Sequence, residues 1–119
     1  MIETIKINEV EYVRKDQANQ QAEKLDGLDY CMIRTIGAGV FAGYIKRRDG
    51  KEADLVNARR IYYWSGAATL SQLATEGTKK PNDCKFCIPI SVTVLDIVEI
   101  IKITDQAKKS IDGVALWKM

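Results

Sequence analysis

The sequence contains no histidine. Histidine is the commonest general base and metal ligand near neutral pH, so its absence also removes every Ser-His or Cys-His nucleophile from consideration. A mechanism based on carboxylates remains open, but no two Asp or Glu residues stand at a spacing that indicates one. We therefore expect a protein that is not an enzyme and that uses no cofactor.

Cysteine is scarce as well, with only Cys31, Cys84 and Cys87. An odd number of thiols and no signal peptide fit a reducing cytoplasm better than secretion. The Cys84-x-x-Cys87 pair is half of a zinc motif, but the other half is missing and only Cys31 remains as a third thiolate. A redox pair should open a helix, whereas Pro89 follows here. Reduced thiols and no metal site are the expectation.

Neither long apolar runs nor an excess of one charge is present. No stretch approaches the ~20 apolar residues of a membrane span, so we expect a soluble protein that makes no membrane contact. The 18 Lys and Arg against 16 Asp and Glu give a net charge of +2. That balance does not predict binding of bulk nucleic acid. The basic residues form short clusters at 46–48, 59–60, 79–80 and 108–109, which by default are solvated faces.

What the sequence does have is a dense stretch at residues 57–74, NARRIYYWSGAATLSQLA. Residues 60–64 are rich in β-branched and aromatic side chains, which predicts a strand. Small residues then break the pattern, and Thr69-Leu70-Ser71-Gln72 has the form of a capping box. A helix should begin near residues 67–69, with Gly77 following its last turn.

The corner between this strand and this helix suits an anion. A helix start offers free N–H groups and the positive end of a dipole, and Gly66 lets a ligand approach the backbone. Arg59 and Arg60 supply forked donors for phosphate, and Tyr62 or Trp64 can stack on a base. The alternative is that the aromatic residues are core and the arginines are solvated charges.

The rest of the chain predicts a small sheet. We expect extended segments at 1–14, a polar helix at 16–24 and strands at 30–36 and 40–45. Asp49-Gly50 predicts a hairpin that pairs 44–47 with 52–56, and Asn57-Ala58 should interrupt the chain before the next strand. The pattern continues with a loop at 78–89 and a core strand at 91–104, with or without one helical turn before it. It ends with a helix at about 105–111, capped by Thr104 or Asp105, and a terminal strand or packing arm at 114–117.

These elements predict one α+β domain over residues 1–119. It should hold an antiparallel sheet, a meander of four to six strands, with two or three short helices. An open apolar sheet edge carrying Trp and Tyr residues predicts a homo-oligomer. Two further residues on the strands are candidates for ligand contact. Arg34 lies in mid-strand, although it can also snorkel to solvent, and glycines flank Phe41, which permits close approach of a ligand or of a neighbouring strand.

The runs YYWSGAATLSQLATEGTKKP, NARR and GAGVFAGY resemble the signature of a small domain that recurs in tailed phages and prophages, over about residues 30–117. This domain is similar to phage anti-defence sponges of the Thoeris anti-defence type. Such proteins sequester cyclic ADP-ribose signals and, in some members, cyclic oligonucleotides. The resemblance implies a location in the cytoplasm of the bacterial host. It transfers no binding residue to this chain, so the site residues come from residue chemistry.

Three functions follow as hypotheses. The first is a phage anti-defence protein that encloses a small anionic nucleotide signal without degrading it, with Lys108 and Lys109 closing a second site between subunits. The second is a protein-interaction module that binds and inhibits a host protein through the aromatic stretch; a structural or assembly component of a phage is a third reading. An exposed flat aromatic patch without a cavity would favour the host protein. The candidate ligand residues are Arg34, Phe41, Asn57, Arg59, Arg60, Tyr62, Trp64, Ser65, Gly66, Ala67, Lys108 and Lys109.

Overall fold

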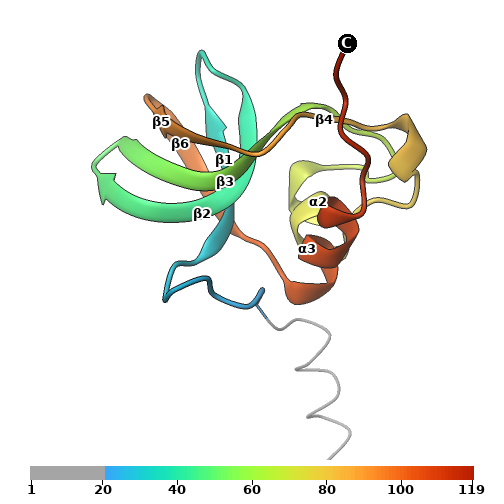
Figure 1. Cartoon of the computed structure of the whole chain (residues 1–119), viewed down its shortest axis with the longest axis horizontal. Helices are drawn as coiled ribbons and strands as arrows, with labels where there is room; N and C mark the ends of the chain where they lie inside the picture. The colour runs from blue at the N-terminus through green and yellow to red at the C-terminus, as the bar shows by residue number, and fades with distance from the viewer. Residues whose placement is uncertain (1–20) are drawn as a thin grey trace, which may run out of the picture.

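Three consecutive strands form a meander at the centre of the sheet, and their side chains alternate between two buried faces. The computed structural model describes residues 21–119, and over this range the chain forms a six-stranded antiparallel sheet with two helices in one compact domain. The predicted α+β class is therefore confirmed. The elements are β1 (Tyr30–Thr35), β2 (Val40–Asp49), β3 (Glu52–Tyr63), α2 (Leu70–Glu76), a 3-10 turn (Pro81–Asp83), β4 (Lys85–Phe86), β5 (Ile90–Val94), β6 (Ile97–Lys102) and α3 (Asp105–Asp112) (Figure 1).

The hairpin between β2 and β3 forms as predicted. Tyr44 pairs with Val56 and Asp49 pairs with Glu52, so the turn is the two residues between them. Gly50 takes a positive φ of 60° in that turn, which a residue without a Cβ adopts at low cost.

The predicted interruption at residues 57–58 is wrong, because β3 runs through it without a break. Asn57 instead adopts φ 49°, and the pairing register with β2 shifts beside it, between Ala42 and Tyr44. Asparagine is one of the few residues that tolerates this region. The shift brings Ala58 so close that a Cβ on Gly43 would lie 2.6 Å from the Cβ of Ala58. The bulge therefore bends β3 and requires glycine on the neighbouring strand.

The predicted single strand at 91–104 is also wrong. It is two strands, with β5 pairing β3 and β6 pairing β1, at opposite ends of the order β5-β3-β2-β1-β6. A short turn joins them at Leu95 and Asp96, where Asp96 has φ 57°. A turn this short can join the two ends only if the sheet is strongly curled, as the bent β2 and β3 show (Figure 1).

The curled sheet is buried on both sides. Inside the curl lie Ile33, Phe41 and Leu55 with their neighbours. The outer face packs against the helices and contributes Met32 and Tyr44 to a second core. Alternating residues of β1 thus enter different cores, because successive side chains of a strand point to opposite faces.

Both helices begin at threonine caps, as predicted. Thr69 Oγ1 accepts from Gln72 N at 3.1 Å, and Gly77 with φ 83° ends α2. Thr104 Oγ1 accepts from Ala107 N at 3.1 Å at the start of α3 and donates to Thr75 O at 2.6 Å. The second bond ties the start of α3 to α2. The predicted loop at 78–89 contains the 3-10 turn and β4.

The segments at the two ends complete the packing. The predicted extended segments at 1–14 lie outside the described residues, as does most of the predicted helix at 16–24. Its described residues are not helical, since Gln21 pairs with Thr104 in a bridge. At the other end Leu116 forms a parallel bridge with Phe86, so residues 114–117 are a packing arm. No helix within residues 21–119 is both long and apolar enough to span a membrane.

Candidate functional site

Arg59 lies on β3 with its guanidinium inside the protein, and only 5% of the residue is exposed. A guanidinium has five N–H donors, and here all of them point at backbone carbonyls. Burial lowers the pKa of Arg59, but arginine remains charged at any physiological pH. We call this group the Arg59 clamp. Its acceptors are Cys87 O at 2.9 Å, Phe86 O at 3.0 Å, Ile111 O at 2.8 Å, Val114 O at 2.9 Å and Ala115 O at 3.3 Å.

The Arg59 clamp leaves no donor for a phosphate. Its role is to hold the segment around β4 and the segment after α3 against β3. Arg59 and Arg60 are neighbours in sequence, but they project to opposite faces of β3. The structure therefore does not assemble the predicted pair of phosphate-binding arginines.

The corner at Gly66 is closed by the protein itself. Gly66 has φ 83°, and a Cβ there would lie 2.5 Å from both Lys80 N and Thr78 Oγ1. Thr78 Oγ1 donates to Ser65 O, and Ser65 N donates to Cys84 Sγ at 3.5 Å. The space predicted for a ligand is thus filled by residues 78–84. Trp64 and Ala67 are half-buried against the helix-side core, and the capping box occupies the start of α2.

Arg60 and Phe41, both predicted site residues, do come together. The guanidinium carbon of Arg60 lies 4.8 Å from the centre of the Phe41 ring, and Phe41 is itself fully buried. Within residues 21–119 no carboxylate forms an ion pair with Arg60. The two residues border a hollow of about 330 Å³. Its other walls are Gly37, Ala38, Val92, Thr93, Val94, Leu95 and Asp96.

Asn57 and Lys108 meet at a different place, a cleft of about 240 Å³ beside α3. The Lys108 ammonium lies 5.1 Å from the Tyr30 ring centre and pairs with Asp112. Burial acts to lower the pKa of Lys108, but the hydrogen bond and charge of Asp112 outweigh it and raise that pKa. Lys109 pairs with Asp105 at 3.1 Å. Lys109 does not line this cleft, and Asp112 already neutralises Lys108, so the cleft is a poorer anion site than the hollow beside Arg60.

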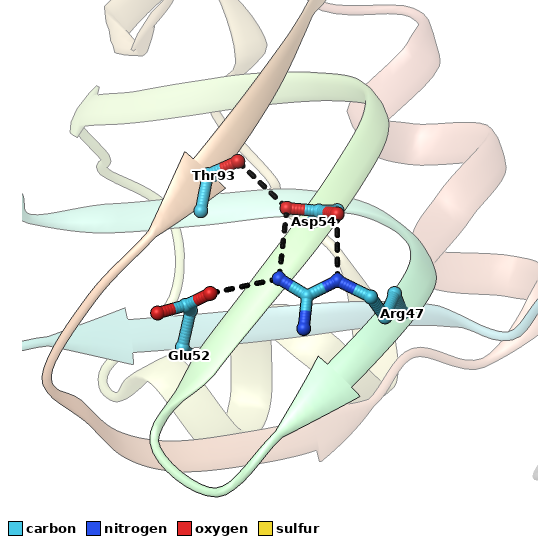
Figure 2. Close-up of polar contacts among 4 residues, drawn as sticks. All are labelled: Arg47, Glu52, Asp54 and Thr93. Atoms are coloured by element: carbon cyan, nitrogen blue, oxygen red, sulfur yellow. Dashed lines mark hydrogen bonds and ion pairs between the residues drawn. The ribbon is translucent and has the colours of Figure 1, made fainter.

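Several other charged side chains on the sheet pair with one another. Arg34, a predicted ligand residue, lies with its Nε 2.9 Å from Glu99 Oε1 on β6, and its side chain is about half exposed. Arg47 donates to Asp54 and Glu52, each at 2.8 Å, and Thr93 donates to Asp54 (Figure 2). The hydrogen bonds from Arg47 and Thr93 lower the pKa of Asp54. This network links the β2–β3 hairpin to β5 and is exposed throughout.

Tyr62 lies apart from all of these groups. Its ring stacks on Trp117 with a centroid distance of 4.8 Å and an interplanar angle of 16°. The sequence placed Trp117 on the expected open apolar edge, but sequence reasoning missed Lys85, which lies beside the Trp117 ring. Over residues 21–119 the cysteines are free thiols, and no three His, Cys, Asp or Glu gather in a way that could hold a metal ion.

The fold and these sites define a small α+β domain whose curled sheet carries a hollow that holds one arginine and one aspartate, Arg60 and Asp96. The chain belongs to a family described as a domain of unknown function (DUF6948), whose model matches residues 28–111. The match begins just before β1 and ends within α3, so it includes Arg59, Arg60 and Gly66 but leaves out Trp117. Searches among curated proteins and among solved structures find no match.

Proposed function

We propose that this domain binds a small anionic nucleotide, without turning it over, in the hollow beside Arg60. The observation that carries the proposal is the placement of the Arg60 guanidinium on the Phe41 ring at the edge of a concave surface. Arg60 is exposed, so the N–H groups of its guanidinium remain open to a ligand while the guanidinium carbon lies over the ring. The planar fork of a guanidinium matches the oxygens of a phosphate and can bind two of them at once.

The remaining walls suit the other parts of a nucleotide. Val92 and Leu95 offer apolar surface to a base or ribose, and Asp96 offers an acceptor for a hydroxyl or amino group. The volume of about 330 Å³ lies at the lower end of the ~300–1,000 Å³ that small-molecule sites span. One copy therefore encloses one nucleotide unit, and a larger cyclic signal extends past the rim.

The biological setting of the proposal rests on the resemblance in sequence. A phage sponge sequesters a cyclic ADP-ribose isomer or a cyclic oligonucleotide and so keeps the signal from its receptor in the bacterial cytoplasm. Such a protein needs affinity and no reaction, and a chain without histidine meets that requirement. The site rests on Arg60 and Phe41, and Arg59 has no part in it.

The test is a thermal-shift panel with cyclic ADP-ribose isomers, cyclic di- and trinucleotides, NAD and ATP. A ligand at a hundredfold excess over its dissociation constant stabilises the native state by about 2.7 kcal/mol, which raises the melting temperature measurably. We expect a shift with at least one cyclic nucleotide, and chromatography should recover that ligand intact.

Two variants locate the site. Arg60→Ala should abolish the shift, and Arg60→Lys should weaken it because an ammonium lacks the planar fork. Arg48→Ala removes the same charge from the hairpin, where Arg48 donates to Gly50 O, and should leave the shift unchanged. A shift that survives in Arg60→Ala would place the ligand elsewhere, and no shift with any ligand would overturn the proposal.

A further inference from the structure

Aromatic side chains gather on the surface where the C-terminal arm crosses the end of β3. Tyr62 is 63% exposed, Tyr63 54%, Leu116 44% and Trp117 40%. The arm is fixed there by the hydrogen bond from Trp117 N to Phe86 O at 2.9 Å. These large apolar side chains therefore have defined positions although they are exposed to solvent.

Two opposite charges lie beside this patch. Lys85 Nζ is 5.3 Å from the Trp117 ring centre, and Asp83 ends the 3-10 turn just before it. Both residues line a hollow of about 460 Å³ together with Tyr63 and Trp117. Neither forms an ion pair with any residue in the range 21–119.

We propose that this surface binds a second copy of the chain about a two-fold axis. In a two-fold interface each contact occurs twice, so a surface must complement itself. This one does: Lys85 of one copy can meet Asp83 of the partner subunit, while the aromatic groups of both copies bury one another. Tyrosine and tryptophan are the residues most enriched in the energetic centres of interfaces.

The surface is independent of the nucleotide hollow, since the residues that line the two hollows do not overlap. A patch of four large side chains falls below the ~800 Å² per partner of a standard interface, so the dimer should be weak and dependent on concentration. The proposed dimer specifies which surface and which symmetry the expected homo-oligomer uses. Its test is independent of the test of nucleotide binding.

Sedimentation velocity of the full chain from about 1 μM to about 1 mM measures the association. We expect a monomer–dimer equilibrium within that range. Trp117→Ala should leave a monomer at every concentration, with its circular dichroism spectrum and urea midpoint used to verify that the domain still folds.

Charge reversal tests the pairing itself. Lys85→Asp alone and Asp83→Lys alone should each be monomeric, because each places like charges together twice. An equimolar mixture of the two variants should form a heterodimer, because both charge pairs are then restored. Lys51→Asp, a reversal in the distant hairpin turn, should dimerise like the unmodified chain.

The outcomes separate the possibilities. Rescue of dimerisation in the mixture, which damage to folding cannot mimic, would establish the two-fold pairing. A mixture that stays monomeric while the unmodified chain dimerises would overturn this interface. An unmodified chain that is monomeric at about 1 mM would also overturn it, and the aromatic surface would then become the site at which to test a host protein.

Discussion

Replacing Arg59 tests how far one buried side chain holds the C-terminal segment in place. Arg59→Leu keeps an apolar stem on β3 but removes every donor of the Arg59 clamp. Phe86 O and Ile111 O keep backbone donors, Trp117 N at 2.9 Å and Val114 N at 3.1 Å. The loss therefore falls mainly on the carbonyls of Cys87 and Val114.

The size of the effect follows from those carbonyls. A buried carbonyl left without a donor costs about 1–3 kcal/mol, and a bond to a charged donor contributes more than a neutral one. We expect Arg59→Leu to lower the free energy of unfolding by about 2–6 kcal/mol, which is the sum over these two carbonyls. Arg59→Lys should lose about 2 kcal/mol, because an ammonium has three donors for five acceptors.

Urea denaturation followed by tryptophan fluorescence measures the free energy of unfolding directly. The matched control is Arg60→Leu, which removes the exposed arginine at the next position of β3 and should change stability by about 0.5 kcal/mol or less. A loss of about 3 kcal/mol corresponds to a fall in melting temperature of roughly 10 °C or more in a domain of this size. Equal losses for Arg59→Leu and Arg60→Leu would refute the reasoning.

Three further predictions concern other parts of the fold. Gly66→Ala should lower the free energy of unfolding, measured by urea denaturation, by about 2–4 kcal/mol, because the added Cβ would lie 2.5 Å from backbone and the φ of Gly66 is positive. Gly37→Ala, with open space around it, is the control and should leave stability unchanged. Similar losses of stability in the two variants would contradict this explanation. Burial raises the pKa of Cys31 from 9.0 to about 11, so the unfolded thiol ionises first and stability should fall as pH rises from about 9 to about 11. Cys31→Val should flatten that fall in urea midpoints, and an unchanged slope would exclude Cys31 as its source. Thr104→Val should cost about 2 kcal/mol by thermal melt, through loss of a cap and a buried hydrogen bond; Thr75→Val, whose hydroxyl is exposed, is the control and should cost far less.

Local signals in the sequence predicted local structure. The hairpin at Asp49 and the capping box at Thr69 depend on residues a few positions apart, so the sequence alone was enough. The bulge at Asn57 and the division of residues 91–104 depend on pairing with distant strands. Arg34 on β1 meets Glu99 on β6, 65 residues away, and no local pattern records such a partner.

The candidate site divides in the same way. Strand alternation, a signal present in the sequence, already places Arg59 and Arg60 on opposite faces once residues 60–64 are taken as part of a strand. The fate of Arg59 was not predictable, because its acceptors lie 27 to 56 residues further along the chain. For Gly66, too, the contact with distant residues was not predictable. Its positive φ serves close approach, as expected, but the group that approaches is the protein's own backbone.

The curled sheet also fixes the order in which the domain can be completed. During synthesis β1, β2 and β3 emerge first and can pair with one another at once. The outer edge of β1 must wait for β6, and the Arg59 clamp must wait for residues 111–115. Contacts that span so much of the chain slow folding, because a long loop must close before they form. A nascent chain that stops at residue 96 thus holds five of the six strands, but the outer edge of β1 is open and three of the five acceptors of Arg59 are missing. The ribosome must deliver almost the entire domain before its fold can close.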